Sequence, residues 1–298
     1  MYRRKIILAL IESFGGKLCA TDFQKLLFIF SDRQVDRRYS FVPYKYGCFS
    51  FQAMADKNKL VYEGYLENSK SWILKNGNSS FKDALNGTDN KLLNEVTDQF
   101  QNFSTGDLIR YVYLNYPYYA INSCITEKWL SLKERERINR HRPVNKIPTL
   151  FTIGYEGQSI EEYLNALINN NIKILCDVRK NALSRKYGFS KKTLEKTCNA
   201  VNIEYIHIPE LGIVSQKREN LHTQEDYAVL FSEYEGTVLV QQGNHLKFIH
   251  NLLIEYSRVA LTCFEASPRQ CHRTRVANSV HSMGRDIPLI HLQNTKEY

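Results

Sequence analysis

Between residues 150 and 292, short apolar segments alternate with stretches of helical periodicity, and this alternation constrains the fold more than any other feature of the chain. Each apolar segment has the length of a buried strand, and the stretches between them are long enough for helices. The expected strands are residues 150–153, 172–177, 203–208, 258–264 and 287–291. Strands that alternate with helices predict an α/β domain with a mostly parallel sheet flanked by helices.

The residues before this region have a mainly helical pattern. Residues 4–14 predict a helix that ends at the Gly15-Gly16 pair. Either Thr21 or Asp22 can cap a second helix, which continues through residue 30. Two helices joined by a short turn make a unit the size of a helix-turn-helix.

An aromatic segment, residues 39–51, contains Pro43 and Gly47 and predicts a strand or a β-hairpin. Two helices followed by a strand pair are typical of a winged helix, whose second helix could enter a major groove. The N-terminal domain is therefore expected to be helical with a winged-helix-like unit. Further helices are expected over residues 51–65, 92–100, 105–114 and 124–137, and a strand over 71–74.

A basic run ending in Pro143 and Pro148 separates the two patterns. Because Glu134 and Glu136 alternate with its cations, part of the run is expected to be a solvated helix face with internal ion pairing. The predicted domains are residues 1–145, helical and winged-helix-like, and residues 149–298, α/β.

The charge and the cysteines bear on the partners and the cellular location of the protein. The net charge of +9 favours polyanionic partners, because lysine and arginine release counterions when they bind phosphates. Seven cysteines, an odd number without a C-x-x-C pair, favour a reducing cytoplasm. The apolar run near the N-terminus stops at Glu12 and predicts a helix, not a signal peptide, and no segment is long enough to predict a membrane partner.

Polar residues follow three of the expected strands. Gly154-Tyr155-Glu156-Gly157 comes after the first strand, Asp177 and Arg179 close the second, and Cys263 and Glu265 close the fourth. In parallel sheets, ligands bind beyond the carboxyl ends of the strands. The sequence therefore predicts a polar, enzyme-like site at this edge of the sheet.

Seven short motifs carry a resemblance to a known family. They are Thr152-Ile153-Gly154-Tyr155-Glu156-Gly157, Asp177-Val178-Arg179, Ser184-Arg185, Gly188-Phe189-Ser190-Lys191, Leu211-Gly212, Cys263-Phe264-Glu265 and Cys271-His272-Arg273. Their order and spacing over residues 150–292 resemble the family of domains of unknown function 488. The resemblance implies no agreed reaction. One departure is Ala182, where many relatives place proline, and it bears on the rigidity of that loop.

Cys271 is the candidate nucleophile. Ser267 and Pro268 can start a helix, and a thiol in its first turn would meet the positive end of the helix dipole with several arginines nearby, which favours thiolate. The same amides and arginines could instead bind a phosphate, with Cys271 packed under the loop. A purely structural thiol is the third alternative.

Asp177 and Glu265 are the other candidate catalytic residues, either as base and acid or as partners that clamp arginines. Tyr155 and Tyr187 could stack on a base, whereas His207 and His291 lie on apolar strands and are expected in the core. The predicted substrate-binding residues are Tyr155, Glu156, Arg179, Ser184, Arg185, His272 and Arg273.

Zinc ligation by Cys263, Cys271, His272 and Cys176 is a lesser alternative. Cys263 and Cys271 are eight residues apart, and no second close ligand pair accompanies them. We predict no metal and no cofactor.

Three functions are compatible with these features. The preferred one is an enzyme that acts on or binds DNA, RNA or nucleotides through an arginine-rich site. The second is a binding module without catalysis, a regulator that binds nucleic acid or a protein partner, or an antitoxin-like protein of a bacterial defence or toxin locus; a homo-oligomer is also possible. Its support is Phe23-Gln24-Lys25-Leu26-Leu27-Phe28-Ile29-Phe30 with Tyr44-Lys45-Tyr46-Gly47, which resembles Panacea-type antitoxin-associated domains. The third is an enzyme of small metabolites.

Overall fold

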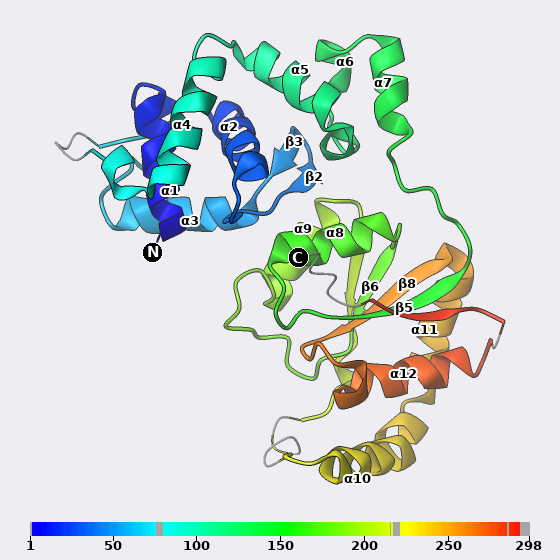
Figure 1. Ribbon diagram of the computed structural model, residues 1–298. Coiled ribbons are helices and arrows are strands. Elements are labelled where there is room, and N and C mark those ends of the chain that lie inside the picture. The colour runs from blue at the N-terminus through cyan, green and yellow to red at the C-terminus, as the bar shows by residue number, and fades with distance from the viewer. Residues whose placement is uncertain (1, 76–79, 215, 217–220, 285, 293–298) are drawn as a thin grey trace. The chain divides into compact units, whose positions relative to one another are not determined.

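The computed structural model describes residues 2–75, 80–214, 216, 221–284 and 286–292. The chain divides into two compact units, Met1–Arg142 and Pro143–Tyr298. Figure 1 shows a helical first unit and a second unit built around a sheet. Among the described residues, no helix combines the length and apolar character needed to span a membrane.

The N-terminal unit consists of helices and two small strand pairs. Its elements are α1 (Tyr2–Ser13), β1 (Lys17–Leu18), α2 (Ala20–Arg33), β2 (Val42–Tyr44), β3 (Gly47–Phe49), α3 (Phe51–Tyr62), β4 (Trp72–Ile73), η1 (Lys82–Ala84), α4 (Gly87–Phe100), α5 (Thr105–Asn115), η2 (Pro117–Ala120), α6 (Thr126–Trp129) and α7 (Leu132–Asn139). Strands β2 and β3 form the expected hairpin, and β1 pairs with β4.

Helix α2 begins earlier than its sequence suggests, because Cys19 caps it by accepting a hydrogen bond from the Asp22 backbone. Residues 23–31 of α2 are all buried, Lys25 among them. A helix that reads a DNA groove must expose one face to the bases. The middle of α2 therefore offers no exposed face to a DNA groove, and the hairpin alone does not establish a winged helix, so the winged-helix-like unit stays a prediction.

The expected helix over residues 124–137 is divided into α6 and α7. Leu130 is extended between them, and Ser131 starts α7 through a capping box with Glu134. The side chain of Glu134 pairs with Arg110 on α5 at 2.8 Å. Its partner therefore lies outside the basic run, in contrast to the internal pairing that we expected.

The C-terminal unit contains a five-stranded, fully parallel sheet in the order β7-β6-β8-β5-β9. The strands are β5 (Thr149–Gly154), β6 (Ile174–Asp177), β7 (Glu204–His207), β8 (Arg258–Cys263) and β9 (Leu289–Leu292), and the helical segments are α8 (Ile160–Asn169), α9 (Lys191–Asn199), η3 (Pro209–Leu211), α10 (Gln224–Tyr234), a π-helical turn η5 (Glu235–Leu239), α11 (Gly243–Tyr256), η6 (Pro268–Gln270) and α12 (His272–His281). The five expected strands are thereby confirmed.

Helices cover both faces of this sheet. In Figure 1, α8 and α9 lie on one face, and α11 and α12 lie on the other. On the second face, buried residues of α10, α11 and α12 pack against β6 and β8 in an apolar core that includes Ile174, Cys176 and Leu261. Strand β6 leads through α9 to β7 at one side, whereas β8 leads through α12 to β9 at the other. The carboxyl ends of β6 and β8 therefore flank a topological switch point, where parallel sheets bind their ligands.

Candidate functional site

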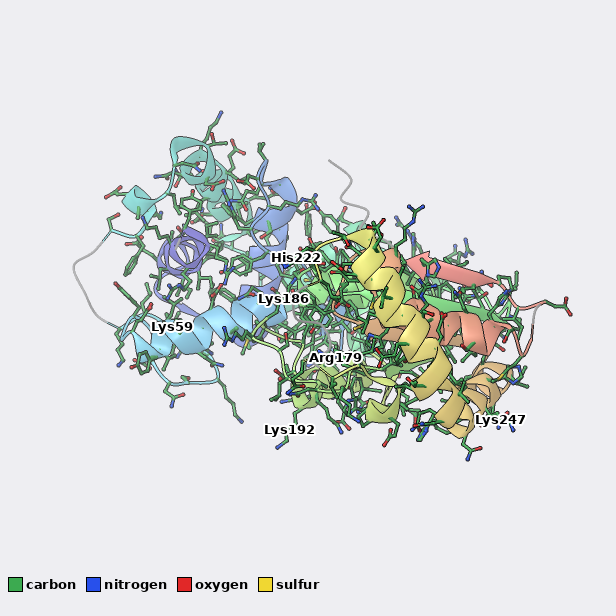
Figure 2. All side chains as sticks on the ribbon, turned by 90° about the horizontal axis from the view of Figure 1, so that it is seen from below. Lys59, Arg179, Lys186, Lys192, His222 and Lys247 are labelled. Atoms are coloured by element: carbon green, nitrogen blue, oxygen red, sulfur yellow. The ribbon has the colours of Figure 1, made fainter. Side chains whose placement is uncertain are left out.

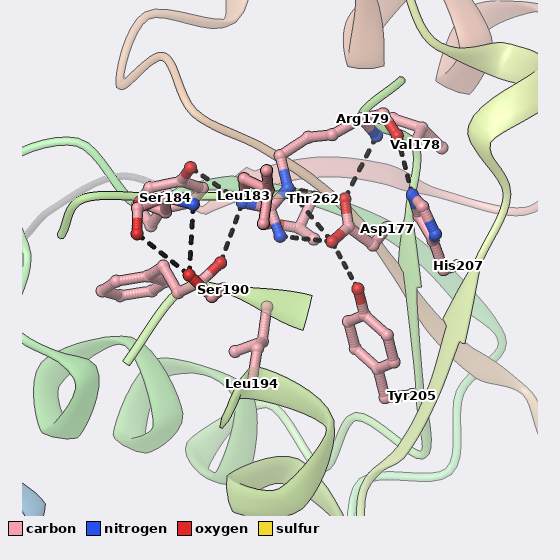
Figure 3. Close-up of polar contacts among 12 residues, drawn as sticks. Asp177, Val178, Arg179, Leu183, Ser184, Ser190, Leu194, Tyr205, His207 and Thr262 are labelled. Atoms are coloured by element: carbon pink, nitrogen blue, oxygen red, sulfur yellow. Dashed lines mark hydrogen bonds and ion pairs between the residues drawn. The ribbon is translucent and has the colours of Figure 1, made fainter. Parts of the chain in front are cut away.

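The first cluster at the switch point is an ion pair at the end of β6. Asp177 is fully buried, and its two carboxylate oxygens accept hydrogen bonds from Arg179 Nε at 2.8 and 3.0 Å. Tyr205 donates to Asp177 Oδ2 at 2.6 Å. Figure 3 shows Asp177 held between Arg179 and Tyr205. Burial and the nearby Asp177 raise the pKa of the Tyr205 hydroxyl, so Tyr205 stays a donor.

Arg179 also donates hydrogen bonds to two groups other than Asp177. Its Nη1 donates to the hydroxyl of Tyr155 at 2.8 Å and to the carbonyl of Phe189 at 2.9 Å. The Tyr155 ring is buried and stacked on Phe189 with a centroid separation of 4.3 Å. We call Asp177, Arg179, Tyr155 and Tyr205 the clamp. Because all four are buried, Tyr155 is not available to stack on a base and Arg179 is not a free phosphate-binding cation.

The second cluster lies at the end of β8 and the start of α12. Sγ of Cys263, Sγ of Cys271 and one ring nitrogen of His272 lie within 4.8 Å of one another, and all three residues are buried. We call these three residues the thiol cluster. The Cys263 thiol also donates to Glu265 Oε2 at 3.2 Å. Glu265, half-buried on the loop after β8, therefore borders the cluster.

His272 joins the thiol cluster to the end of β6. Its Nε2 lies 2.9 Å from the carbonyl of Val178. Because a carbonyl only accepts, this nitrogen must carry the proton, and in the neutral ring Nδ1 then has the lone pair. That Nδ1 lies 3.7 Å from Cys263 Sγ. The sequence-predicted residues His272, Cys271 and Glu265 are thus brought together.

Cys271, the candidate nucleophile, is a buried thiol. Pro268–Gln270 forms a 3-10 turn, and Cys271 is the residue that precedes α12, with a fully buried side chain. Burial and the neighbouring Cys263 thiol raise the pKa of Cys271 well above its ordinary value, whereas His272 acts in the opposite direction. The expected dipole effect is outweighed, and Cys271 is a protonated thiol at neutral pH.

Arg273 and Glu156 hold the loop between these clusters. The guanidinium of Arg273 is buried and donates to the carbonyls of Glu265 and Ala266. Glu156 is exposed, and its carboxylate accepts from the Ala266 backbone at 2.9 Å. Gly154 lies beneath the same loop, where a β-carbon would stand 1.8 Å from the Glu265 carbonyl oxygen. The loop is therefore fixed from three directions.

The remaining predicted residues lie on the loop between β6 and α9. Ser184 is half-buried and exchanges hydrogen bonds with Ser190, as Figure 3 shows, while Arg185 is exposed. Lys186, which sequence reasoning missed, donates to the Tyr155 carbonyl at 2.8 Å. Sequence reasoning also missed Tyr205, although it lies two residues before His207 on one strand, a spacing that places both on the same face.

His207 and His291, expected in the core, are half-buried and hydrogen-bonded. His207 Nε2 donates to the Arg179 carbonyl at 2.8 Å, and His291 Nδ1 lies 2.8 Å from the hydroxyl of Thr152. Both histidines therefore have partners within the fold.

Residues 159–280 match the family model described as Domain of unknown function DUF488. The match supports the predicted family resemblance for the C-terminal half, and it includes the thiol cluster and the Asp177–Arg179 pair. No curated protein and no solved structure matches the chain.

The DUF488-matched region also contributes most of an open groove beside the thiol cluster. This groove has a volume of about 770 Å³. Its lining residues, which define the α10–α12 groove, are Gln224, Tyr227, Ala228, Phe231, Ser267, Pro268, Arg269, Thr274, Arg275 and His291. Ser267, Pro268 and Arg269 belong to the segment that follows β8, so the groove opens beyond the carboxyl end of that strand.

Proposed function

We propose that the C-terminal unit binds a phosphate-bearing ligand, a nucleotide or a nucleic-acid strand, in the α10–α12 groove. The observation that carries this proposal is the presence of two arginines, Arg269 and Arg275, on one groove. The groove also contains the hydroxyl residues Ser267 and Thr274. Guanidinium groups bind phosphate through paired hydrogen bonds, and hydroxyls add further donors.

The two arginines differ in how firmly they are held. Arg269 is exposed, whereas Arg275 lies 5.0 Å above the Phe231 ring and 3.6 Å from Glu235. Arg275 is therefore fixed in position, and Arg269 can adjust to a ligand. The half-buried ring of Tyr227 on the same groove offers a surface for a base.

The proposed cationic site is the α10–α12 groove, whereas the sequence suggested Arg179 and Arg273. Arg179 and Arg273 are buried and bonded to protein groups, so they organise the strand ends and leave ligand binding to the groove. The net charge of +9 supports an anionic ligand. Catalysis through Cys271, Glu265 or Asp177 stays a prediction, as does the Panacea-like resemblance of the N-terminal residues.

The test is binding of full-length protein to labelled single- and double-stranded DNA and RNA, and to a fluorescent nucleotide, over a salt series. The variant is Arg269→Ala/Arg275→Ala. The matched control is Lys192→Ala/Lys247→Ala, which removes the same charge from two side chains that extend away from the ribbon in Figure 2. We expect the variant to bind more weakly and its salt slope to fall by about two, because each lost phosphate contact removes about one.

Circular dichroism would first confirm that both double variants fold. Equal weakening by the control would show an effect of bulk charge and overturn the groove as the site. No binding of wild type at low salt would overturn the proposal altogether. Binding that ignores salt and requires only the nucleotide would favour the small-metabolite alternative.

A further inference from the structure

The thiol cluster has the composition of a metal site. It offers two thiol sulfurs and one imidazole nitrogen, the ligands that zinc prefers in proteins. These groups come from two segments of the chain, the end of β8 and the start of α12, and the fold brings their ligand atoms within 4.8 Å of one another. The eight-residue separation that argued against a metal in the sequence is closed by the folded loop.

The spacing inside the cluster agrees with tetrahedral coordination. With zinc–sulfur and zinc–nitrogen bonds of about 2.3 and 2.0 Å, the sulfur and nitrogen ligands of a tetrahedral site should lie about 3.5 Å apart. Cys263 Sγ and His272 Nδ1 are separated by 3.7 Å. These two ligand atoms would therefore need little movement to bind a metal, and Cys271 Sγ lies within 4.8 Å of both.

The imidazole of His272 is oriented as a ligand should be. In metal sites, a ligating histidine usually donates its other N–H to a carbonyl or a carboxylate, which fixes the ring and its tautomer. His272 Nε2 donates to the Val178 carbonyl at 2.9 Å, which leaves the Nδ1 lone pair on the side of the two thiols.

Glu265 can supply the fourth ligand. Its Oε2 lies 3.2 Å from Cys263 Sγ. Cys176, which the sequence suggested for this place, belongs to the apolar core together with Ile174 and Leu261. Arg273 fixes the backbone of Glu265 and brings a buried positive charge close to a set of anionic ligands.

We propose that Cys263, Cys271 and His272 hold a zinc ion, with Glu265 as its fourth ligand. None of these four residues lines the α10–α12 groove, so the metal site and the phosphate groove are tested by different substitutions. Failure of one proposal leaves the other standing.

The experiment is metal analysis of the full-length protein, without an affinity tag, after reconstitution with zinc under reducing conditions. We expect about one zinc ion per chain in wild type and its loss in Cys263→Ala. The matched control is Cys198→Ala, which removes another fully buried thiol of the same unit and should keep the metal. Calorimetry in buffers of different ionisation enthalpy should show proton release, because the thiols must deprotonate to bind.

Substitution of Co²⁺ makes the result independent of how well the cysteine variant folds. In wild type, Co²⁺ should give sulfur-to-metal charge-transfer bands and the intense visible bands of a tetrahedral site. Glu265→Gln should keep the charge-transfer bands and change the visible bands. A wild-type protein without metal or cobalt bands under reducing conditions would overturn the proposal, as would a Cys263–Cys271 disulfide that persists there or a Cys263→Ala variant with unchanged metal content.

Discussion

Asp177 and Arg179, two residues apart at the end of β6, form an ion pair in which both side chains are buried, with 0% and 6% of their surface exposed. A buried pair contributes little when compared with an apolar pair, but the loss of one partner leaves an uncompensated charge in the interior. The clamp is therefore most sensitive to changes in a single member.

Asp177→Asn should lower the free energy of unfolding of the C-terminal unit by about 3–5 kcal/mol, because the buried guanidinium loses its counter-charge. Urea unfolding followed by circular dichroism measures this. Asp36→Asn is the control, because the pair of Asp36 with Arg38 is at the surface and its loss should cost at most about 1 kcal/mol. Similar losses in both variants would contradict the assigned role of the clamp.

Gly154→Ala should destabilise the same unit by about 1–3 kcal/mol or more. Its new β-carbon would lie 1.8 Å from the Glu265 carbonyl oxygen, which belongs to backbone held by Arg273 and cannot simply rotate away. Gly236→Ala is the matched change, since nothing lies within 4 Å of a β-carbon there, and it should be neutral or slightly stabilising. Scanning calorimetry of the two variants decides: equal unfolding temperatures would refute the close approach.

Lys57→Met should destabilise the N-terminal unit by about 1–3 kcal/mol, because three carbonyls lose a shared donor. Lys57 Nζ lies 2.8, 3.2 and 2.8 Å from the carbonyl oxygens of Ser69, Lys70 and Ser71. Tryptophan fluorescence measures this unit selectively, since the chain's two tryptophans are Trp72 and Trp129.

The control for Lys57 is Lys59→Met on the same helix. Lys59 is labelled in Figure 2, is half exposed and lies 3.8 Å from Glu63. Its substitution should change stability by no more than about 0.5 kcal/mol. If both variants unfold alike, the three carbonyl contacts of Lys57 do not stabilise the unit.

The protonation of His291 should make the folded state less stable at low pH. Burial, followed by the positive charge of Arg273, lowers the pKa of His291 below its ordinary 6.5. Between that lowered value and 6.5 the unfolded chain holds more protons than the folded one, so stability is lost as the pH falls through this interval. In His291→Gln this part of the pH dependence should disappear from urea unfolding curves; a variant with the wild-type pH dependence would show that another group is responsible.

The sheet could be predicted because its signals are local. Parallel strands covered on both faces are continuous apolar runs, and β5, β6 and β8 are buried along their whole length. The capping box of Ser159 and Glu162 at the start of α8 was equally readable and is confirmed, since both partners lie within one helical turn.

Which arginines are buried and which are exposed could not be predicted. Arg179 and Arg185 look alike in the sequence, yet the first is buried and the second exposed. What separates them is Tyr155, 24 residues away, and the Phe189 carbonyl, which reach Arg179 only in the folded chain. The sequence named Cys263, Cys271 and His272 as possible ligands, but it could not show that they lie together, because Arg273 holds the loop after β8 over Gly154 only in the folded chain.

The strand order also governs how the C-terminal unit forms during synthesis. Within this sheet, strand β5 is synthesised first, but its hydrogen-bonded neighbours β8 and β9 are the last two strands of the sheet to be synthesised. Only β6 and β7 can pair early, and β6 still lacks β8 on its other side. The backbone of β5 therefore stays unpaired until Arg258 and the residues of β8 and β9 have been synthesised, which makes folding of this unit slow and dependent on those two strands.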